Sequence, residues 1–346
     1  MYDIITIGSA TRDLFAKTGA FDVRKNIHLA GGLEGCLPLG AKIDIKDLIF
    51  DTGGGATNTG VAFSFLGMKT ATVCRLGHDF AGKEIVRILK EAGVETKFIT
   101  YDKKIRTAYS IVLLTEMGER TILVFRGASR TFGHSSIPWK NLKSRWLYIS
   151  SLGGNLKLLS QILNIAQKRN IKVGWNPGGL EIKMGLKKLK PLIKKVDVLI
   201  MNEEEVLTLL SQKSLSDSPF AKGREPLSSP FEKGGLRGIL KTLRLLPRRA
   251  LAVTMGGKGA MAADKNNLLT ARAVGKKILN TTGAGDAFSA GFIAGLWRWN
   301  DPSLALRLGI LNSGHVVAKM GAKAGLLKRL PSKAKLGQLP IHSLNK

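Results

Sequence analysis

The sequence has little cysteine and no long apolar run. Its 346 residues include two cysteines, Cys36 and Cys74, without a C-x-x-C spacing, which excludes a disulfide scaffold. A membrane-spanning helix needs about 18 apolar residues, and the longest uncharged stretch, Thr52–Met68, is short and rich in glycine and threonine. The segment Met1–Gly8 lacks a basic region followed by an apolar one, so we expect no signal peptide and a strand instead. We therefore expect a cytoplasmic protein in a reducing compartment, with no membrane partner.

Acidic residues are also scarce. The chain has 25 Asp and Glu against 54 Lys and Arg, a formal net charge of +29, while its hydrophobic content of 44% is enough for a core and excludes a disordered chain. This charge indicates either an acidic partner such as nucleic acid or a basic solvated surface. The basic run between Lys183 and Lys195 has no interleaved aromatic residues on which bases could stack. We interpret it as a solvated helix face and disfavour nucleic acid as a partner.

Short apolar segments alternate with amphipathic ones along most of the chain. This alternation predicts an α/β layered fold with a mainly parallel sheet, which we place in a single domain over residues 1–330. The expected strands are Ile4–Ile7, Ala71–Cys74, Leu147–Ile149, Val173–Trp175, Val198–Met201 and Leu251–Thr254. The expected helices are Thr57–Leu66, Gly82–Ala92, Leu156–Lys168, Met184–Lys194 and Glu203–Leu210.

Four segments interrupt this rhythm. Residues 14–50 are irregular, and residues 97–126 read as strands without crossover helices, so together they predict a small separate sheet or flap. Residues 212–249 contain the near-repeat S-P-F-x-K-G and predict an inserted, exposed, flexible loop, with a basic interaction tract as the alternative. Residues 331–346 read as a basic C-terminal tail.

The most informative motif is Asn280-Thr-Thr-Gly-Ala-Gly-Asp286, which precedes an apolar helix. Its glycines let several backbone N–H groups converge, and the start of a helix adds partial positive charge, so the motif predicts an anion site. Asp286 stands where a carboxylate could take a proton from a hydroxyl beside a bound phosphate. The alternative is that Asp286 only caps the helix.

Four weaker motifs follow other predicted strands, and each has an ordinary structural alternative as a turn or a helix start. Gly53–Gly60 is a glycine turn that runs into a helix, and Asp13 follows Gly8 at a strand end, where open α/β sheets bind ligands. Asn202–Glu205 offers oxygens suited to a hydrated Mg²⁺. Val253–Gly259 is a strand that enters a glycine turn.

In this order the motifs resemble those of the ribokinase-like (PfkB) carbohydrate kinase family, over roughly residues 1–326. Gly53–Leu66 with Leu76–Gly82 is similar to the N-terminal signature of the family, and Asn280–Gly291 is similar to its C-terminal signature. The N-x-x-E element corresponds to Asn202 and Glu205, and the late Gly-Ala pair to Gly321 and Ala322.

The resemblance implies a Rossmann-like three-layer core with a small β-sheet lid, which would account for residues 14–50 and 97–126. It implies transfer of a phosphoryl group from ATP, with Mg²⁺, to a hydroxyl of a sugar or sugar-like substrate. Asp286 would be the catalytic base, and the backbone of Gly283, Ala284 and Gly285 the anion hole.

The resemblance also implies binding residues. Substrate would be held by Asp13, Gly53, Gly54 and Asn58, with Arg106 either reaching an anionic substrate or remaining a solvated lid charge. The nucleotide would contact Asn202, Thr254, Gly256, Gly259 and Thr281. Asn202 and Glu205 would order Mg²⁺ and its waters.

One departure concerns the first position of the C-terminal signature, where this chain has Asn280 in place of the usual aspartate. In family members activated by a monovalent cation that aspartate helps to hold K⁺, so the resemblance leaves K⁺ dependence open. The five histidines (His28, His78, His134, His315 and His342) show no ligand spacing, and we expect no zinc site.

Three questions stay open at this stage. A nucleoside (adenosine-type) kinase of the same family is the nearest alternative to a sugar kinase, because specificity depends on the geometry of the lid. A nucleic-acid-binding protein on a kinase-like scaffold is a more distant one. The lids of family members can pair edge to edge, so a homodimer is a further expectation that no sequence feature decides.

Overall fold

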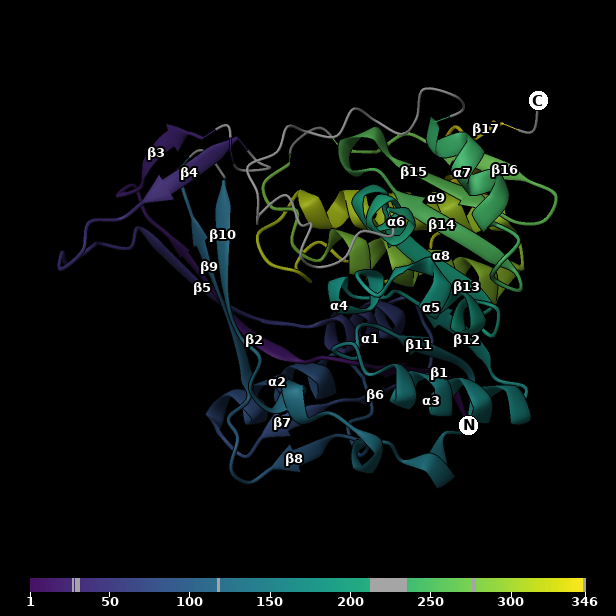
Figure 1. Cartoon of the computed structure of the whole chain (residues 1–346), viewed down its shortest axis with the longest axis horizontal. Helices are drawn as coiled ribbons and strands as arrows, with labels where there is room; N and C mark the ends of the chain where they lie inside the picture. Colours follow the sequence, from purple (N-terminus) through teal and green to yellow (C-terminus); the bar gives the residue numbers. More distant parts are fainter. Residues whose placement is uncertain (27, 29–31, 117–118, 212–234, 276–277, 345–346) are drawn as a thin grey trace.

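The computed structural model of the chain describes residues 1–26, 28, 32–116, 119–211, 235–275 and 278–344 (Figure 1). Its largest sheet has nine strands in the order β17-β16-β15-β14-β13-β12-β11-β1-β6. The parallel part consists of β6 (Thr70–Val73), β1 (Tyr2–Ile7), β11 (Ser144–Ile149), β12 (Lys172–Trp175), β13 (Val198–Asn202) and β14 (Ala250–Thr254). The antiparallel extension consists of β15 (Ala260–Ala263), β16 (Leu268–Ala271) and β17 (His342–Ser343).

Helices cover both faces of this sheet, because the side chains of the buried strands point alternately to the two sides. One apolar cluster packs against α1 (Gly55–Phe65), α2 (Phe80–Glu91), α8 (Ala284–Trp299), α9 (Pro302–Val317) and α10 (Lys333–Gly337). The other packs against α3 (Leu156–Lys168), α4 (Gly179–Ile182), α5 (Gly185–Ile193), α6 (Glu203–Leu210) and α7 (Gly235–Leu243). Short 3-10 helices lie at Gly127–Thr131, His134–Ser136, Trp139–Asn141 and Gly256–Lys258. The predicted three-layer core is confirmed.

A second, four-stranded sheet in the order β10-β9-β2-β5 stands beside the core and forms the lid (Figure 1). Its central strand β2 runs antiparallel to β5 and parallel to β9, so the lid joins segments that are far apart in the sequence. The strands are β2 (Thr11–Lys17), β5 (Asp47–Gly53), β9 (Ala108–Leu114) and β10 (Arg120–Phe125). Smaller pairs are β3 (Asp22–Lys25) with β4 (Leu33–Cys36), and β7 (Arg75–Gly77) with β8 (Thr100–Asp102).

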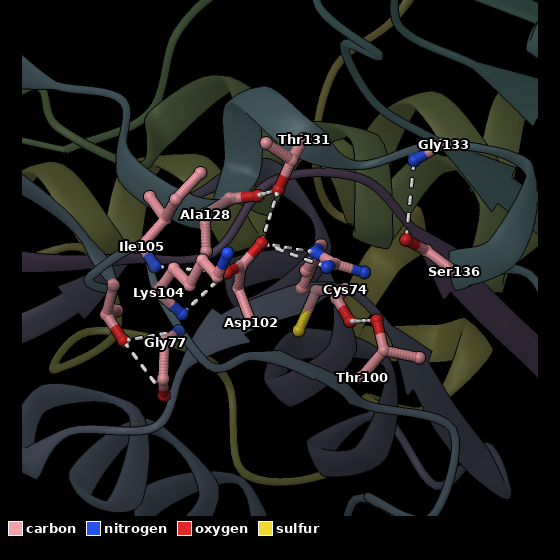
Figure 2. A network of polar contacts seen from close by, with 12 residues as sticks. Cys74, Gly77, Thr100, Asp102, Lys104, Ile105, Ala128, Thr131, Gly133 and Ser136 are labelled. Atoms are coloured by element: carbon pink, nitrogen blue, oxygen red, sulfur yellow. Dashed lines mark hydrogen bonds and ion pairs between the residues drawn. The ribbon is translucent and has the colours of Figure 1, made fainter.

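Asp102 holds the chain where it enters the lid (Figure 2). Its carboxylate accepts backbone N–H groups of Lys104 and Ile105, both at 3.0 Å, and pairs with Arg75 Nη2 at 2.9 Å. The Lys104 N–H, together with Arg75 and Ile105, holds the pKa of Asp102 well below its usual range. The turn that leads into β9 is therefore fixed to the pair β7–β8 before the lid begins.

The segment expected as one exposed loop differs from the prediction in its second half. Residues 212–234 lie outside the described residues, but residues 235–243 form α7. In α7, Leu240 and Leu243 are buried and Ile239 packs beside them. The helical spacing of these apolar residues was obscured by the surrounding glycine and basic residues, so the prediction of a loop was wrong for α7.

The C-terminal segment also differs from the expected basic tail. Leu336 of α10 is fully buried in the core, and β17 pairs with β16 at the edge of the large sheet. Arg237 Nη2 of α7 donates to the carbonyl oxygen of Leu344 at 2.7 Å. A few apolar residues between the lysines are enough to dock this segment, because each one packs at an edge of the core that is already formed.

The charged surface agrees with the sequence. Lys187, Lys188 and Lys190 of α5 and Lys194 directly after it are exposed, as expected for a solvated helix face. Within the described ranges, no helix is long and apolar enough to cross a membrane.

Candidate active site

Asp286 lies in the first turn of α8, directly after the glycine turn. Gly283 precedes the helix with a φ of 81°, a conformation that favours glycine. A Cβ atom at Gly283 would lie 2.7 Å from the carbonyl oxygen of Ala322, so this turn packs directly on the segment that follows α9. Because the N-cap residue is glycine, it has no side chain to cap α8, which leaves N–H groups of the first turn available to an anion.

The Asp286 carboxylate does not cap its own helix. It accepts a hydrogen bond from Asn58 Nδ2 in α1, with a distance of 2.8 Å to Oδ2. Burial raises the pKa of Asp286 to about 6, while Asn58 and the ammonium of Lys323 oppose this rise and Asp13 adds to it. A carboxyl group with this pKa is ionised at neutral pH yet basic enough to accept a proton, which favours the catalytic interpretation over the cap.

Asp13 and Gly53 meet where β2 and β5 pair. Asp13 is 5% exposed, accepts Thr11 Oγ1 at 2.8 Å, and has a pKa raised by burial. A Cβ atom at Gly53 would lie 2.0 Å from Asp13 Oδ2, so any side chain there would displace the carboxylate. Gly54 follows with a φ of 93° and leads into α1 and Asn58. Asp13 therefore lies inside the lid strand β2 and not in a turn after β1, which corrects its expected position.

Asn202, Glu205 and Thr254 lie on the other side of Asp286. The Asn202 side chain accepts the N–H of Glu205 at 2.7 Å, and Glu205 Oε2 accepts the N–H of Asn202 at 2.8 Å, which forms a capping box for α6. Thr254 pairs with Asn202 in the register of β13 and β14. One cavity is lined by all three residues together with Asp286, Gly283 and Gly285. The cavity therefore brings together the motif around Asp286 and the ends of β13 and β14.

The glycines after β14 have a structural role in the turn between β14 and β15. A Cβ atom at Gly259 would lie 2.0 Å from the carbonyl oxygen of Ala271, so this glycine lets the turn between β14 and β15 approach the end of β16. Gly256 has a φ of 55° in the same turn. Neither glycine lines the cavity that contains Asp286. Their contact with a nucleotide remains a prediction.

The described part of the chain has few side chains that could coordinate a metal ion directly. No group of three or more His, Cys, Asp or Glu side chains there could hold an ion, and the five histidines are exposed. Burial raises the pKa of Glu205, and one of its carboxylate oxygens is used in the capping box. The other oxygen, with the Asn202 side chain, fits the ordering of waters around a Mg²⁺ ion that arrives with phosphates.

The structure does not bring Arg106 to the other site residues through any contact in the described ranges. Its side chain is exposed near Asp79 at the base of the lid. Arg120 of β10 contacts Thr281 Oγ1 instead, and so links the lid edge to the glycine turn before α8. The sequence contained only a weak signal for Arg120, a cation directly after a turn between two strands.

Several of the described segments of this site contain buried polar atoms without a hydrogen-bond partner, as do other parts of the core such as Ser144 and Trp175. Among the described residues, the buried side-chain atoms without a hydrogen-bond partner include Thr52 Oγ1, Asn58 Oδ1, Asn280 Nδ2, Thr282 Oγ1 and Ser289 Oγ. Buried polar groups are seldom left without a partner, so the atoms in these segments are available to hydrogen-bond a polar ligand.

In the site, a buried carboxylate lies beside a helix start that is open to an anion. Together with the α/β core and its lid, this arrangement is typical of a phosphotransferase. Residues 3–329 match the pfkB family carbohydrate kinases, and the chain belongs to this family.

The chain resembles several known proteins over most of its length. It is 27% identical over 271 residues to an uncharacterized sugar kinase of Archaeoglobus fulgidus, and the alignment covers 77% of this chain and 98% of that protein. Its fold matches Arabidopsis thaliana ribokinase complexed with ribose and ATP, with a TM-score of 0.76, 19% identity and coverage of 98% and 99% of the two chains. It also matches the Methanocaldococcus jannaschii nucleoside kinase, with a TM-score of 0.69, 20% identity and 97% of each chain covered.

Proposed function

We propose that the protein transfers the γ-phosphoryl group of ATP to a hydroxyl group of a sugar. The observation that carries this proposal is the position of Asp286. It lies at the start of α8, is buried enough to raise its pKa to about 6, and accepts a hydrogen bond from Asn58 of α1, the helix that follows the lid strand β5. This position supports a role for Asp286 as a proton acceptor between phosphate at the start of α8 and a hydroxyl-bearing substrate beside Asn58.

The substrate side consists of Asp13, Gly53, Gly54 and Asn58. Asp13 and Asn58 Oδ1 would accept hydrogen bonds from substrate hydroxyl groups, and Gly53 keeps the Asp13 carboxylate in place. Lid strands on both sides of Asp13 would exclude water from the bound substrate. Asp286 would then take the proton of the attacking hydroxyl.

The nucleotide side consists of the start of α8 and the ends of β13 and β14. The backbone of Gly283, Ala284 and Gly285 would stabilise the charge on the transferred group. Asn202, Thr254, Gly256, Gly259 and Thr281 would contact the nucleotide. Mg²⁺ bound with ATP would neutralise phosphate charge, and Asn202 with Glu205 would hold its waters.

The test is coupled ATP turnover with purified protein against pentoses, hexoses, sugar acids, sugar phosphates and nucleosides. We expect turnover with a free or phosphorylated sugar. Turnover with nucleosides alone would replace the sugar by the nucleoside alternative, and steep salt-dependent binding to RNA or DNA without any turnover would refute the kinase. The panel is run in K⁺ and in Na⁺, because Asn280 is neutral and accepts the Thr282 N–H at 2.9 Å.

The pKa of Asp286 predicts the pH dependence of the reaction. Its folded pKa lies above the ordinary aspartate value, so below about pH 6 the carboxyl group is protonated and cannot accept a proton. We expect kcat/KM to rise with pH through this value and then to level off, with protonation of Asp13 contributing at the acid end because burial raises its pKa as well. Coupled assays across this range measure it, and a flat profile would contradict the assignment.

We also propose that the protein acts in the cytoplasm, where ATP is available.

We further propose that the lids of two copies pair to form a homodimer. At the lid edge, β10 exposes Ile122, Leu123, Val124 and Phe125, each by between 44% and 54%. Exposed apolar edge strands tend to pair with another chain. We expect sedimentation analysis to show a dimer that Leu123→Lys converts to monomers. Leu245→Lys, at a residue 63% exposed far from the lid in sequence, should have no effect, and a wild-type monomer would exclude the dimer.

A further inference from the structure

Lys323 is a buried lysine that the reaction outlined above does not use. It is 7% exposed and lies in the segment after α9. A buried ammonium group needs opposite charge and hydrogen-bond acceptors around it. Its Nζ atom contacts the carbonyl oxygen of Thr52 and lies 3.5 Å from Asp51 Oδ1, and both acceptors belong to the lid strand β5.

The same segment holds Asp51 from a second direction. The N–H of Ala322 donates to Asp51 Oδ2 at 3.0 Å. Gly321 lies so close that a Cβ atom there would be 2.8 Å from this oxygen. We call Asp51, Ala322 and Lys323 the hinge clamp, because they fix the core end of β5 to the segment after α9.

The hinge clamp lies between two turns of the site. We call residues 53 and 54 the substrate turn and residues 283–285 the phosphate turn. On one side, Thr52 is followed by Gly53, which packs on the Asp13 carboxylate. On the other side, the backbone of Ala322 supports Gly283, at the start of α8. The relative position of the substrate turn and the phosphate turn therefore depends on this clamp.

Charge points to the same role. The carboxylates that face the Lys323 ammonium come from three elements: Asp51 in β5, Asp13 in β2 and Asp286 in α8. Burial lowers the pKa of Lys323, and these carboxylates oppose that effect. In turn, Lys323 opposes the rise in the pKa of Asp286.

We propose that Lys323 is a positioning residue for phosphoryl transfer: its ammonium holds the substrate turn of the lid in register with the phosphate turn, and it supplies the positive charge that Asp13, Asp51 and Asp286 share. The inference rests on the proposed role of Asp286. Neither the sequence motifs nor the matches to known proteins assign a function to Lys323.

The first test is Lys323→Met, which keeps the length of the side chain and removes its charge. We expect kcat to fall on the order of ten-fold, with a smaller change in the KM for ATP. We also expect the midpoint of the kcat/KM profile to move up by about one pH unit, because Asp286 loses its cationic neighbour. The matched control is Lys328→Met on the same segment, an exposed lysine whose Nζ lies 3.6 Å from the centroid of the Phe65 ring. This control should leave both quantities unchanged.

A double variant separates positioning from simple stabilisation. Lys323→Met leaves Asp51 without its buried partner and is expected to lower Tm, whereas Asp51→Asn combined with Lys323→Met removes both charges and should recover most of the stability. The proposal requires the low kcat and the raised midpoint to persist in the double variant, since Asp51 is not among the groups that shift Asp286. A double variant with kcat within about two-fold of wild type and an unchanged midpoint would overturn it. If the single variant does not fold, the double variant alone decides.

A measurement without substrate keeps this test apart from the proposed function. Carboxyl-carbon NMR of the free protein follows the titration of Asp286 directly, and we expect its midpoint to rise in Lys323→Met and in the double variant. An unchanged midpoint refutes the proposal for Lys323 even if the protein is a kinase. Lack of turnover with every acceptor refutes the proposed function, while the titration still reports on Lys323.

Discussion

Asp286→Asn is expected to lower kcat by about 10²- to 10⁴-fold, the range that a positioned general base contributes. The amide can still bond with Asn58, which lies 2.8 Å from the carboxylate in the native chain, but it cannot take a proton from the substrate. Coupled turnover with the best acceptor of the panel measures the loss. ATP binding, followed by calorimetry, should change little because the backbone of the glycine turn is unaltered.

The stability of Asp286→Asn shows whether the loss of kcat comes from the missing base or from partial unfolding. The folded pKa of Asp286 is raised to about 6, so the protein loses stability as pH rises from the ordinary aspartate value through 6, while the carboxyl group becomes charged. The neutral amide avoids this cost, and Tm at neutral pH should equal or exceed that of the wild type. The matched control is Asp301→Asn at the start of α9, where the carboxylate only caps the helix through Ser303 and Leu304. Turnover of Asp286→Asn within a few fold of wild type would disprove its role as base.

Gly285→Ala is expected to reduce kcat/KM on the order of 100-fold, comparable with the effect of misplacing a reacting group by about 1 Å. Apart from its own stretch of α8, a Cβ atom at Gly285 would meet none of the described residues within 4 Å, although Gly285 lines the cavity beside Asp286. The added methyl group would therefore occupy space left for the transferred phosphoryl group. Steady-state kinetics with varied ATP measure the loss.

Gly238→Ala is the matched control for this prediction. Gly238 is also a helical glycine whose Cβ would meet nothing within 4 Å, but it lies in α7, which packs on the other side of the sheet from α8. Both substitutions should keep Tm or raise it slightly, because alanine favours helices. The gain in the free energy of unfolding should be less than about 1 kcal/mol for each. Equal activity of the two variants would mean that the start of α8 does not approach a phosphate.

The elements of the core and the motif around Asp286 could be predicted because their signals are local. A glycine turn followed by an apolar helix is readable within a dozen or so residues, and buried parallel strands appear as short apolar runs. The place of Asp13 could not be read in this way. Only Gly8, Ser9 and Ala10 separate β1 from β2, and β2 is held in the lid by β5 and β9, which lie much later in the chain.

The contacts of buried charged residues were the second feature that the sequence could not predict. Lys323 looks like one more basic residue in a chain with 54 of them, and its partner Asp51 lies 272 positions away. Likewise, whether Arg106 or Arg120 reaches the site depends on how β9 and β10 pair over the core, which is a property of the lid and not of either sequence neighbourhood. Contacts of this kind arise only from tertiary structure.

The position of β1 has a consequence for biosynthesis. Strand β1 is translated before both of its neighbours, β6 and β11, and β11 follows only after all four lid strands have been translated. The emerging chain must therefore keep the edge of β1 that will face β11 unpaired until the whole lid has been synthesised, a period in which chaperones commonly protect nascent chains. Lid and core are thus expected to acquire their native pairing in one late cooperative step, rather than as separate units in order of translation.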